Sequence, residues 1–439
     1  MNRYGTMTEI IPVVFILLFS LYQEFNKKVR RHSLRLPFGV LQILLFFYLF
    51  GPSIWNLIRT SAGDGLLGFI PSTPESAEKF RNILFPMIIA TFLADQFAVH
   101  YLKISKLYIQ DFTGARKTMT KETKILTIFL VVLPMFIWLA GEGGSILSRT
   151  QYLYSNGIPT LLRLSGITHQ VSVFTLAFLS FAIDRNHRAF KGFCLVSFVW
   201  VILLLSKGSR TAILILSIAF IYIWKMSHRR YQKVVTLLVG LVSLQVCVSA
   251  VFLAREEPHG ILNLPTMLSR AWSETYGIES SQTLDAMSRF ISSIFNIVIV
   301  VPLSVDTTSS GVIWANANPL ISSISENSLD FSTNGVQRLF PYGWVPTSSA
   351  GALFGIVGFF GIFIITFVAN LIQSIAFIYY RRTSTFPIYA LISACYLAQT
   401  WSFLQYSTRP WFRMWWALLF SFGALLIWVL SRRLIERNH

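Results

Sequence analysis

Residues 36–57 read LPFGVLQILLFFYLFGPSIWNL, an apolar stretch without a charged side chain. A helix of this length crosses the hydrocarbon core of a bilayer, which is about 30 Å thick. Comparable stretches recur along the chain. We place eleven spans near residues 8–22, 36–57, 83–102, 125–140, 167–183, 193–206, 211–224, 234–254, 349–379, 388–404 and 412–431. The sequence therefore predicts an all-α polytopic membrane protein.

Composition and charge agree with this class. Charged residues make up 13% of the 439 residues, against about 25% in soluble domains, and the mean hydropathy is +0.58. A formal charge of +18 first suggests nucleic acid. However, 23 of the 37 Lys and Arg residues lie in alternate short loops and the C-terminal tail. Such loops face the cytoplasm and anionic lipid, so we expect an outer N-terminus, a cytoplasmic C-terminus and no nucleic-acid partner.

The chain divides into three predicted parts: eight spans in residues 1–254, a large outer segment at 255–348 containing short helices, and three spans in residues 349–439. The stretch 349–379 is too long for one upright span, so it must tilt or extend beyond the lipid. The apolar stretch 290–305 is short, and a crossing there would place Arg381 and Arg382 outside. We therefore expect it to lie in the outer interface or to pack over the helix bundle.

Several kinds of chemistry lack sequence support. There is no GxGxxG, GxxxxGK[ST], GxSxG or HExxH motif. The three cysteines fall inside apolar stretches, which gives no disulfide framework. No dense acidic cluster favours a divalent cation. We therefore predict no metal and no cofactor. The first apolar stretch lacks a cleavage site and is expected to be a retained helix.

Arginines at the outer ends of helices are the main candidates for chemistry. The tight turn SKGSRT at 206–211 places Lys207 and Arg210 at the membrane surface, with Ser209 or Thr211 able to cap the next helix. A guanidinium binds phosphate oxygens bidentately, so we predict an anion site here, although simple snorkelling at a helix end would give the same pattern. Further candidate arginines are Arg149 in a Gly-rich loop, Arg409 before the last span, and Arg270, Arg289 and Arg338 in the outer segment.

Each of these candidates has an ordinary structural alternative. Arg149 can simply pair with Glu142, and the arginines of the outer segment can pair with nearby carboxylates. Tyr342, Trp344 and Ser348 lie in a Pro- and Gly-rich stretch suited to holding sugar rings, but they also fit an aromatic belt at the membrane surface. The candidate general bases are Glu142, His259, Glu326 and Asp330, and the sequence does not choose among them. Asp95, Asn370 and Gln373 fall inside predicted spans, where they are functional candidates or buried polar partners.

Three short motifs resemble the bacterial repeat-unit polymerases of the Wzy type, which build O-antigen and related surface polysaccharides. The motifs are the GSRT turn at 208–211 before an apolar helix, the Pro/Ser motif running into a Gly-rich helix at 345–361, and Arg409 in the last outer turn. The Gly-rich loop 141–154 also fits.

The resemblance implies a GT-C-like glycosyltransferase of the bacterial inner membrane, with its active site at the outer face. Such an enzyme moves a growing glycan from undecaprenyl diphosphate to the non-reducing end of a new lipid-linked repeat unit, without a metal. A chain-length regulator is an expected partner. Arg210, Arg149, Arg289 and Arg409 would stabilise the leaving diphosphate.

Two other classes stay open. O-antigen ligases share the arginine-bearing turn but usually carry a histidine late in the outer loop, and residues 306–349 contain none. A transporter of lipid-linked oligosaccharide would be expected to show two repeated halves, and the chain shows no repeat.

Overall fold

The computed structural model describes a large part of the chain, which forms two compact units. The described stretches are 5–25, 36–62, 72–101, 132–149, 188–209, 230–256, 258–276, 294–305, 348–383, 386–405 and 408–437, with the isolated residues 158, 161, 175, 212, 213, 215, 216 and 317. All elements in these stretches are helices, apart from one isolated β-bridge. The predicted all-α class is confirmed.

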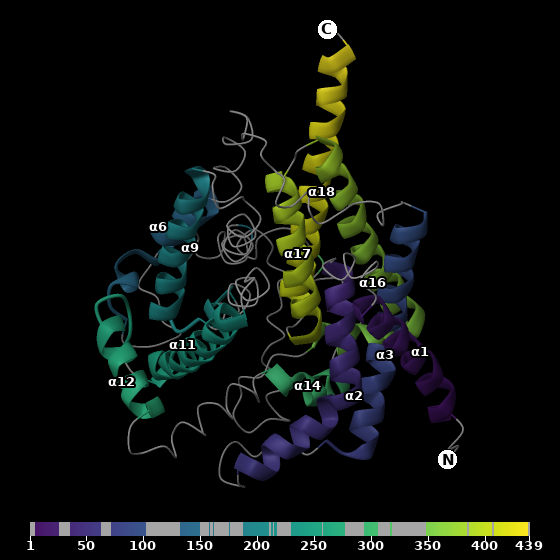
Figure 1. The fold of residues 1–439 in the computed structure, drawn as a ribbon, viewed down its shortest axis with the longest axis horizontal. Coiled ribbons are helices and arrows are strands. Elements are labelled where there is room, and N and C mark those ends of the chain that lie inside the picture. The colour runs from purple at the N-terminus through teal and green to yellow at the C-terminus, as the bar shows by residue number, and fades with distance from the viewer. Residues whose placement is uncertain are drawn as a thin grey trace. The chain divides into compact units, whose positions relative to one another are not determined.

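Unit 1 combines residues 1–114 with residues 294–439. Its helices are α1 (Gly5–Phe25), α2 (Leu36–Ala62), α3 (Pro74–His100), α14 (Ile297–Leu303), α16 (Ser349–Thr383), α17 (Phe386–Gln405) and α18 (Thr408–Arg437). Helix α3 packs against both α2 and α16, and α17 packs against α16 and α18 (Figure 1). Thus helices from the two ends of the chain form one core.

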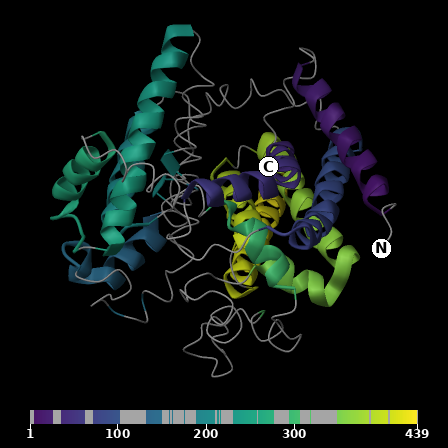
Figure 2. The ribbon, with the colours of Figure 1, turned by 90° about the horizontal axis from the view of Figure 1, so that it is seen from below.

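Unit 2 spans residues 115–293 and carries the candidate site. Its described helices are α6 (Leu133–Glu142), the 3₁₀-helix η4 (Gly143–Ile146), α9 (Arg188–Ser206), α11 (Arg230–Glu256) and α12 (Leu264–Tyr276). Helices α11 and α12 lie side by side in both ribbon views (Figures 1 and 2). Ala271 of α12 is fully buried against the buried side chains of Val246, Ala250 and Leu253 on α11, so this pair forms a helical hairpin.

Five helices in the described residues are long and apolar enough to cross a membrane, which indicates a membrane protein. They are Leu36–Ile58, Pro74–His100, Tyr231–Val251, Ser349–Tyr379 and Trp411–Ser431. These five overlap five of the eleven predicted spans. Ile11–Tyr22 and Leu195–Ser206 are apolar but short. Helix α17 covers the span predicted at 388–404, but polar residues such as Ser393, Gln399 and Ser402 interrupt it. Nearly all of the prediction at 167–183, most of that at 211–224 and the first seven residues of that at 125–140 fall outside the described residues.

Two expectations about individual segments can be compared with the structure. The stretch 349–379 forms α16, which breaks at Gly358 (φ 62°, ψ −162°), a kink that the predicted tilt did not include. Within 290–305, α14 is only seven residues long. Its residues 297–302 are buried, and it packs against α2, α3, α16 and α17. It is therefore a packed helix and not a spanning one, which confirms the second of the two expected arrangements.

The polar residues predicted inside spans meet in a buried network of unit 1. The Tyr396 hydroxyl donates to Asn370 Oδ1 at 2.6 Å, and Asn370 Nδ2 donates to Thr91 Oγ1 at 3.4 Å. Gln373 Nε2 donates to Ser393 Oγ at 2.9 Å. Asp95 is also buried, on α3. These hydrogen bonds tie α3, α16 and α17 together inside the apolar core.

Candidate anion site

The candidate site is built on the end of α9, which stops in a well-defined turn. The backbone N–H of Gly208 donates to Leu205 at 2.8 Å, and that of Ser209 donates to Leu204 at 2.9 Å. This pattern is a Schellman motif, and it needs a left-handed residue just past the helix. Gly208 supplies that residue with φ 69°. Lys207 is thereby fixed at the helix end, as the SKGSRT turn predicted.

A short two-stranded contact joins the loop after α6 to the segment after α11. Arg149 and His259 exchange both backbone hydrogen bonds, at 2.7 and 2.8 Å, and form the isolated bridge. Ile261 and Leu262 donate to Ile146 and Leu147 at 3.0 and 3.1 Å. This contact holds Arg149 and His259 beside the end of α9.

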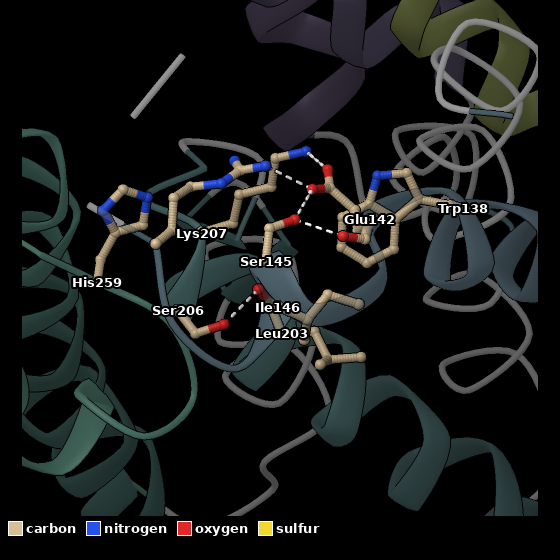
Figure 3. Close-up of a pocket in the computed structure, with 9 residues that line it drawn as sticks. Trp138, Glu142, Ser145, Ile146, Leu203, Ser206, Lys207 and His259 are labelled. Atoms are coloured by element: carbon tan, nitrogen blue, oxygen red, sulfur yellow. Dashed lines mark hydrogen bonds and ion pairs between the residues drawn. The ribbon is translucent and has the colours of Figure 1, made fainter. Parts of the chain in front are cut away.

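Glu142, the last residue of α6, lies at the centre of the charged cluster. Arg149 Nη2 donates to Glu142 Oε2 at 2.5 Å, Lys207 Nζ pairs with Glu142 Oε1, and Ser145 Oγ donates to Oε2 at 3.2 Å. The Glu142 and Arg149 side chains are 2% and 5% exposed, while Lys207 is 31% exposed. Figure 3 shows Glu142 between Lys207 and Ser145. Two cations therefore share one buried carboxylate, and the more exposed of them is Lys207.

Aromatic side chains form one wall of the cluster. Lys207 Nζ lies 4.9 Å from the centroid of the Trp138 ring, within cation–π range. Trp138 packs on Trp200, with ring centroids 5.3 Å apart. Burial lowers the pKa of Lys207 most, Glu142 opposes this by raising the pKa, and the positive charge of Arg149 lowers it further.

The cluster opens into a small pocket lined by Trp138, Glu142, Ser145, Ile146, Arg149, Leu203, Ser206, Lys207 and His259. Its empty volume, including the part open to solvent, is about 220 Å³. The enclosed part has room for about one water molecule, so a phosphate group binding here would have to take the place of a side chain. With one carboxylate against Arg⁺ and Lys⁺, the formal charge is positive, which favours an anion.

The structure brings four of the predicted site residues together: Arg149, Glu142, Lys207 and His259. Ser209 lies in the same turn, but its side chain is not part of the pocket lining. Arg270 is an exposed residue of α12 and does not line the pocket either. Arg409 lies in the first turn of α18, in unit 1. The predictions for Arg210, Thr211, Arg289, Glu326, Asp330, Arg338, Tyr342 and Trp344 lie outside the described residues.

Ser348 has a structural contact in unit 1. Its backbone N–H donates to Ser304 Oγ at 2.8 Å, and its hydroxyl donates to the Phe403 carbonyl at 3.3 Å. These bonds fix the start of α16 against α14 and α17.

Sequence reasoning missed Trp138 and Ser145 as site residues. Ser145 lies three positions after Glu142 in a glycine-rich loop, a spacing that could have pointed to it. The Glu142–Lys207 pair joins residues 65 apart, which no local motif reveals. Among the described residues, no group of three or more His, Cys, Asp or Glu side chains is placed to hold a metal ion.

Comparison of the chain with protein families, curated proteins and solved structures finds no match in any of the three.

Proposed function

We propose that this protein polymerises lipid-linked oligosaccharide repeat units in the bacterial inner membrane. It would transfer the growing glycan from undecaprenyl diphosphate to the non-reducing end of a new undecaprenyl-diphosphate-linked repeat unit. The observation that carries the proposal is the Glu142–Arg149–Lys207 cluster. Its Lys207 belongs to the 206–211 turn, in which the resemblance expects Arg210 to bind diphosphate.

The proposed reaction needs positive charge beside the departing diphosphate. An acceptor hydroxyl oxygen forms a bond to the anomeric carbon of the donor, and the bond between that carbon and the diphosphate oxygen breaks. Negative charge then develops on the departing diphosphate. Arg149 and Lys207 are preplaced donors for it, and such preorganised groups are typically worth about 3–4 kcal/mol each. Because the pocket is small, it would take only the phosphate end of the lipid.

The acceptor hydroxyl must lose its proton to a base. His259 is the better candidate of the two described residues, because the Glu142 carboxylate already accepts from Arg149, Lys207 and Ser145. His259 lines the pocket, and its backbone is held by Arg149. The ring nitrogen of a neutral imidazole can accept a proton, as a general base requires.

The finer features of the proposal follow from the sequence. They are eleven spans, an outer N-terminus, a cytoplasmic C-terminus, an active site at the outer face and a chain-length regulator as partner. A ligase or a transporter of lipid-linked oligosaccharide remains the alternative, and the test below separates these classes.

The first test is deletion of the gene in its native host, followed by gel analysis of the surface polysaccharide. Complementation with Arg149→Ala should leave a single repeat unit on the anchor and no ladder of chain lengths, and an immunoblot of the membrane checks that this destabilised variant is still present. Lys79→Ala, on the exposed surface of α3 in unit 1, is the matched control and should restore the ladder. Free lipid-linked polymer would identify a ligase, and an unchanged ladder after deletion would reject the proposal.

A further inference from the structure

Two cations in unit 2 converge on a single carboxylate from different elements. Arg149 reaches Glu142 Oε2 from the loop after η4, and Lys207 reaches Oε1 from the end of α9. Each cation thus takes one oxygen of the pair. A phosphate group also presents pairs of oxygens to Arg and Lys donors. The position of the Glu142 carboxylate is therefore one that a phosphate group could fill with the same two donors.

An anion is required at this position whether or not a ligand is bound. The Arg149 side chain is 5% exposed, and a guanidinium does not lose its proton in proteins. A buried charge without a partner is strongly destabilising. In the ligand-free protein, Glu142 supplies that partner from within the chain.

The carboxylate is placed where it can leave. Glu142 ends α6 and is followed by Gly143 and Gly144, which are exposed and have no neighbouring atoms within 4 Å of the position of a Cβ. Lys207, at 31% exposure, connects the cluster to solvent. We infer that Glu142 is an internal counter-anion, which a phosphate group displaces when it binds between Arg149 and Lys207.

This inference rests on the proposed anion-binding role of the pocket, and it assigns Glu142 a positioning role in place of a general base. Its rival is a fixed carboxylate that permanently orients the two cations, to which the Ser145 hydroxyl would contribute. The two readings predict opposite effects when the hold on Glu142 is weakened. If phosphate displaces Glu142, a weaker hold on Glu142 strengthens phosphate binding. If Glu142 is a fixed carboxylate, the same change weakens phosphate binding.

The test is thermal unfolding of the purified full chain in detergent, titrated with inorganic diphosphate. Glu142→Gln should unfold at a lower temperature than the wild type without anion, and diphosphate should recover the difference. Its half-saturating diphosphate concentration should fall about tenfold below the wild-type value, because the competing internal anion is gone. A half-saturating concentration equal to or above that of the wild type would overturn the inference.

A second variant covers the case in which Glu142→Gln does not fold. Ser145→Ala removes the hydroxyl that contacts both the carboxylate and the backbone carbonyl of Glu142. It leaves all three charges in place, so it should also lower the half-saturating concentration. An unchanged or raised value contradicts displacement. Arg149→Ala should abolish the stabilisation by diphosphate, both in the wild type and in the Glu142→Gln or Ser145→Ala variant. If the stabilisation is retained, the phosphate binds elsewhere.

Undecaprenyl diphosphate in detergent micelles, titrated in parallel, separates the two sources of the ligand. A gain in Glu142→Gln with either probe supports displacement, and the probe with the larger gain identifies a lipid headgroup or a free phosphate as the ligand. If Glu142→Gln shows this gain while deletion of the gene leaves the polysaccharide ladder unchanged, polymerisation is refuted and the counter-anion role stands.

Discussion

At the scale of single residues, the charged cluster stands out because its members depend on one another. Arg149 is buried against Glu142, and Glu142 is buried against both Arg149 and Lys207. Removal of one partner of a buried pair is strongly destabilising, whereas joint replacement of both is often neutral. The stability of the cluster is therefore expected to be non-additive.

A double-mutant cycle measures this dependence. We expect Arg149→Met to lower the free energy of unfolding by as much as about 3–5 kcal/mol, with some relief because Lys207 still pairs with Glu142. Adding Glu142→Gln to Arg149→Met should recover part of the loss. The measurement is equilibrium unfolding in mixed micelles. Strictly additive effects of the two changes would show that the pair does not interact.

The lowered pKa of Lys207 gives a pH dependence with a definite sign. Burial disfavours the charged ammonium in the folded state, so the unfolded state binds the proton more readily. Stability due to Lys207 is therefore present above the usual pKa of about 10.4 and is lost as the pH falls through the lowered value. We expect the wild type to gain stability relative to Lys207→Met as the pH rises toward that limit. A difference that stays constant across this range would contradict the shift.

At the scale of elements, close approaches of the backbone hold the site and the core. Gly260 has φ 123°, and a Cβ there would lie 2.5 Å from the Leu147 carbonyl oxygen. The contact that carries Arg149 beside His259 thus depends on a residue without a side chain.

Gly260→Ala should destabilise the chain by about 1–3 kcal/mol, the usual cost of a strained backbone residue, and should weaken diphosphate binding by displacing Arg149. Gly39→Ala on α2, in unit 1, is the control, because nothing lies within 4 Å of its Cβ position and it is not part of the site. Thermal unfolding and diphosphate titration of both variants provide the comparison. If Gly260→Ala and its control have the same stability and the same affinity for diphosphate, the contact between residues 260 and 147 adapts to the added methyl group without loss of stability.

In unit 1, Gly351 determines how closely α16 approaches α14. A Cβ there would lie 2.0 Å from the Val301 carbonyl oxygen, so Gly351→Ala must push the two helices apart and cost about 1–3 kcal/mol. Gly39→Ala on α2 meets no atom within 4 Å and should be neutral or stabilising, since alanine favours helix. Unfolding in detergent tests both, and a harmless Gly351→Ala would contradict the tight packing.

At the scale of the whole molecule, charge predicts orientation. A reporter fused after Arg382, at the end of α16, should read as cytoplasmic because the short loop there belongs to the basic set. A fusion within the outer segment, after Asn334, should read as external. An external reading after Arg382 would refute the predicted order of spans.

The class of fold could be predicted because apolar length and loop charge are local properties of a sequence. The turn at Lys207 was also predictable, since a glycine directly after an apolar helix can adopt the left-handed conformation that ends the helix. The pairing of Lys207 with Glu142 was not, because it depends on how α6 and α9 pack. Likewise, no local pattern shows that α14 is buried or that α16 breaks at Gly358.

Unit 1 draws on both the first 114 and the last 146 residues of the chain, with unit 2 between them. During translation, α3 leaves the ribosome long before α16, its main packing partner. The face of α3 that packs against α16 therefore stays uncovered, together with its buried polar residues Thr91 and Asp95, until α16 is made. This core cannot be completed before α16 is made, and loss of α16 would uncover the side of α3 that packs against it, although α3 would keep its contact with α2.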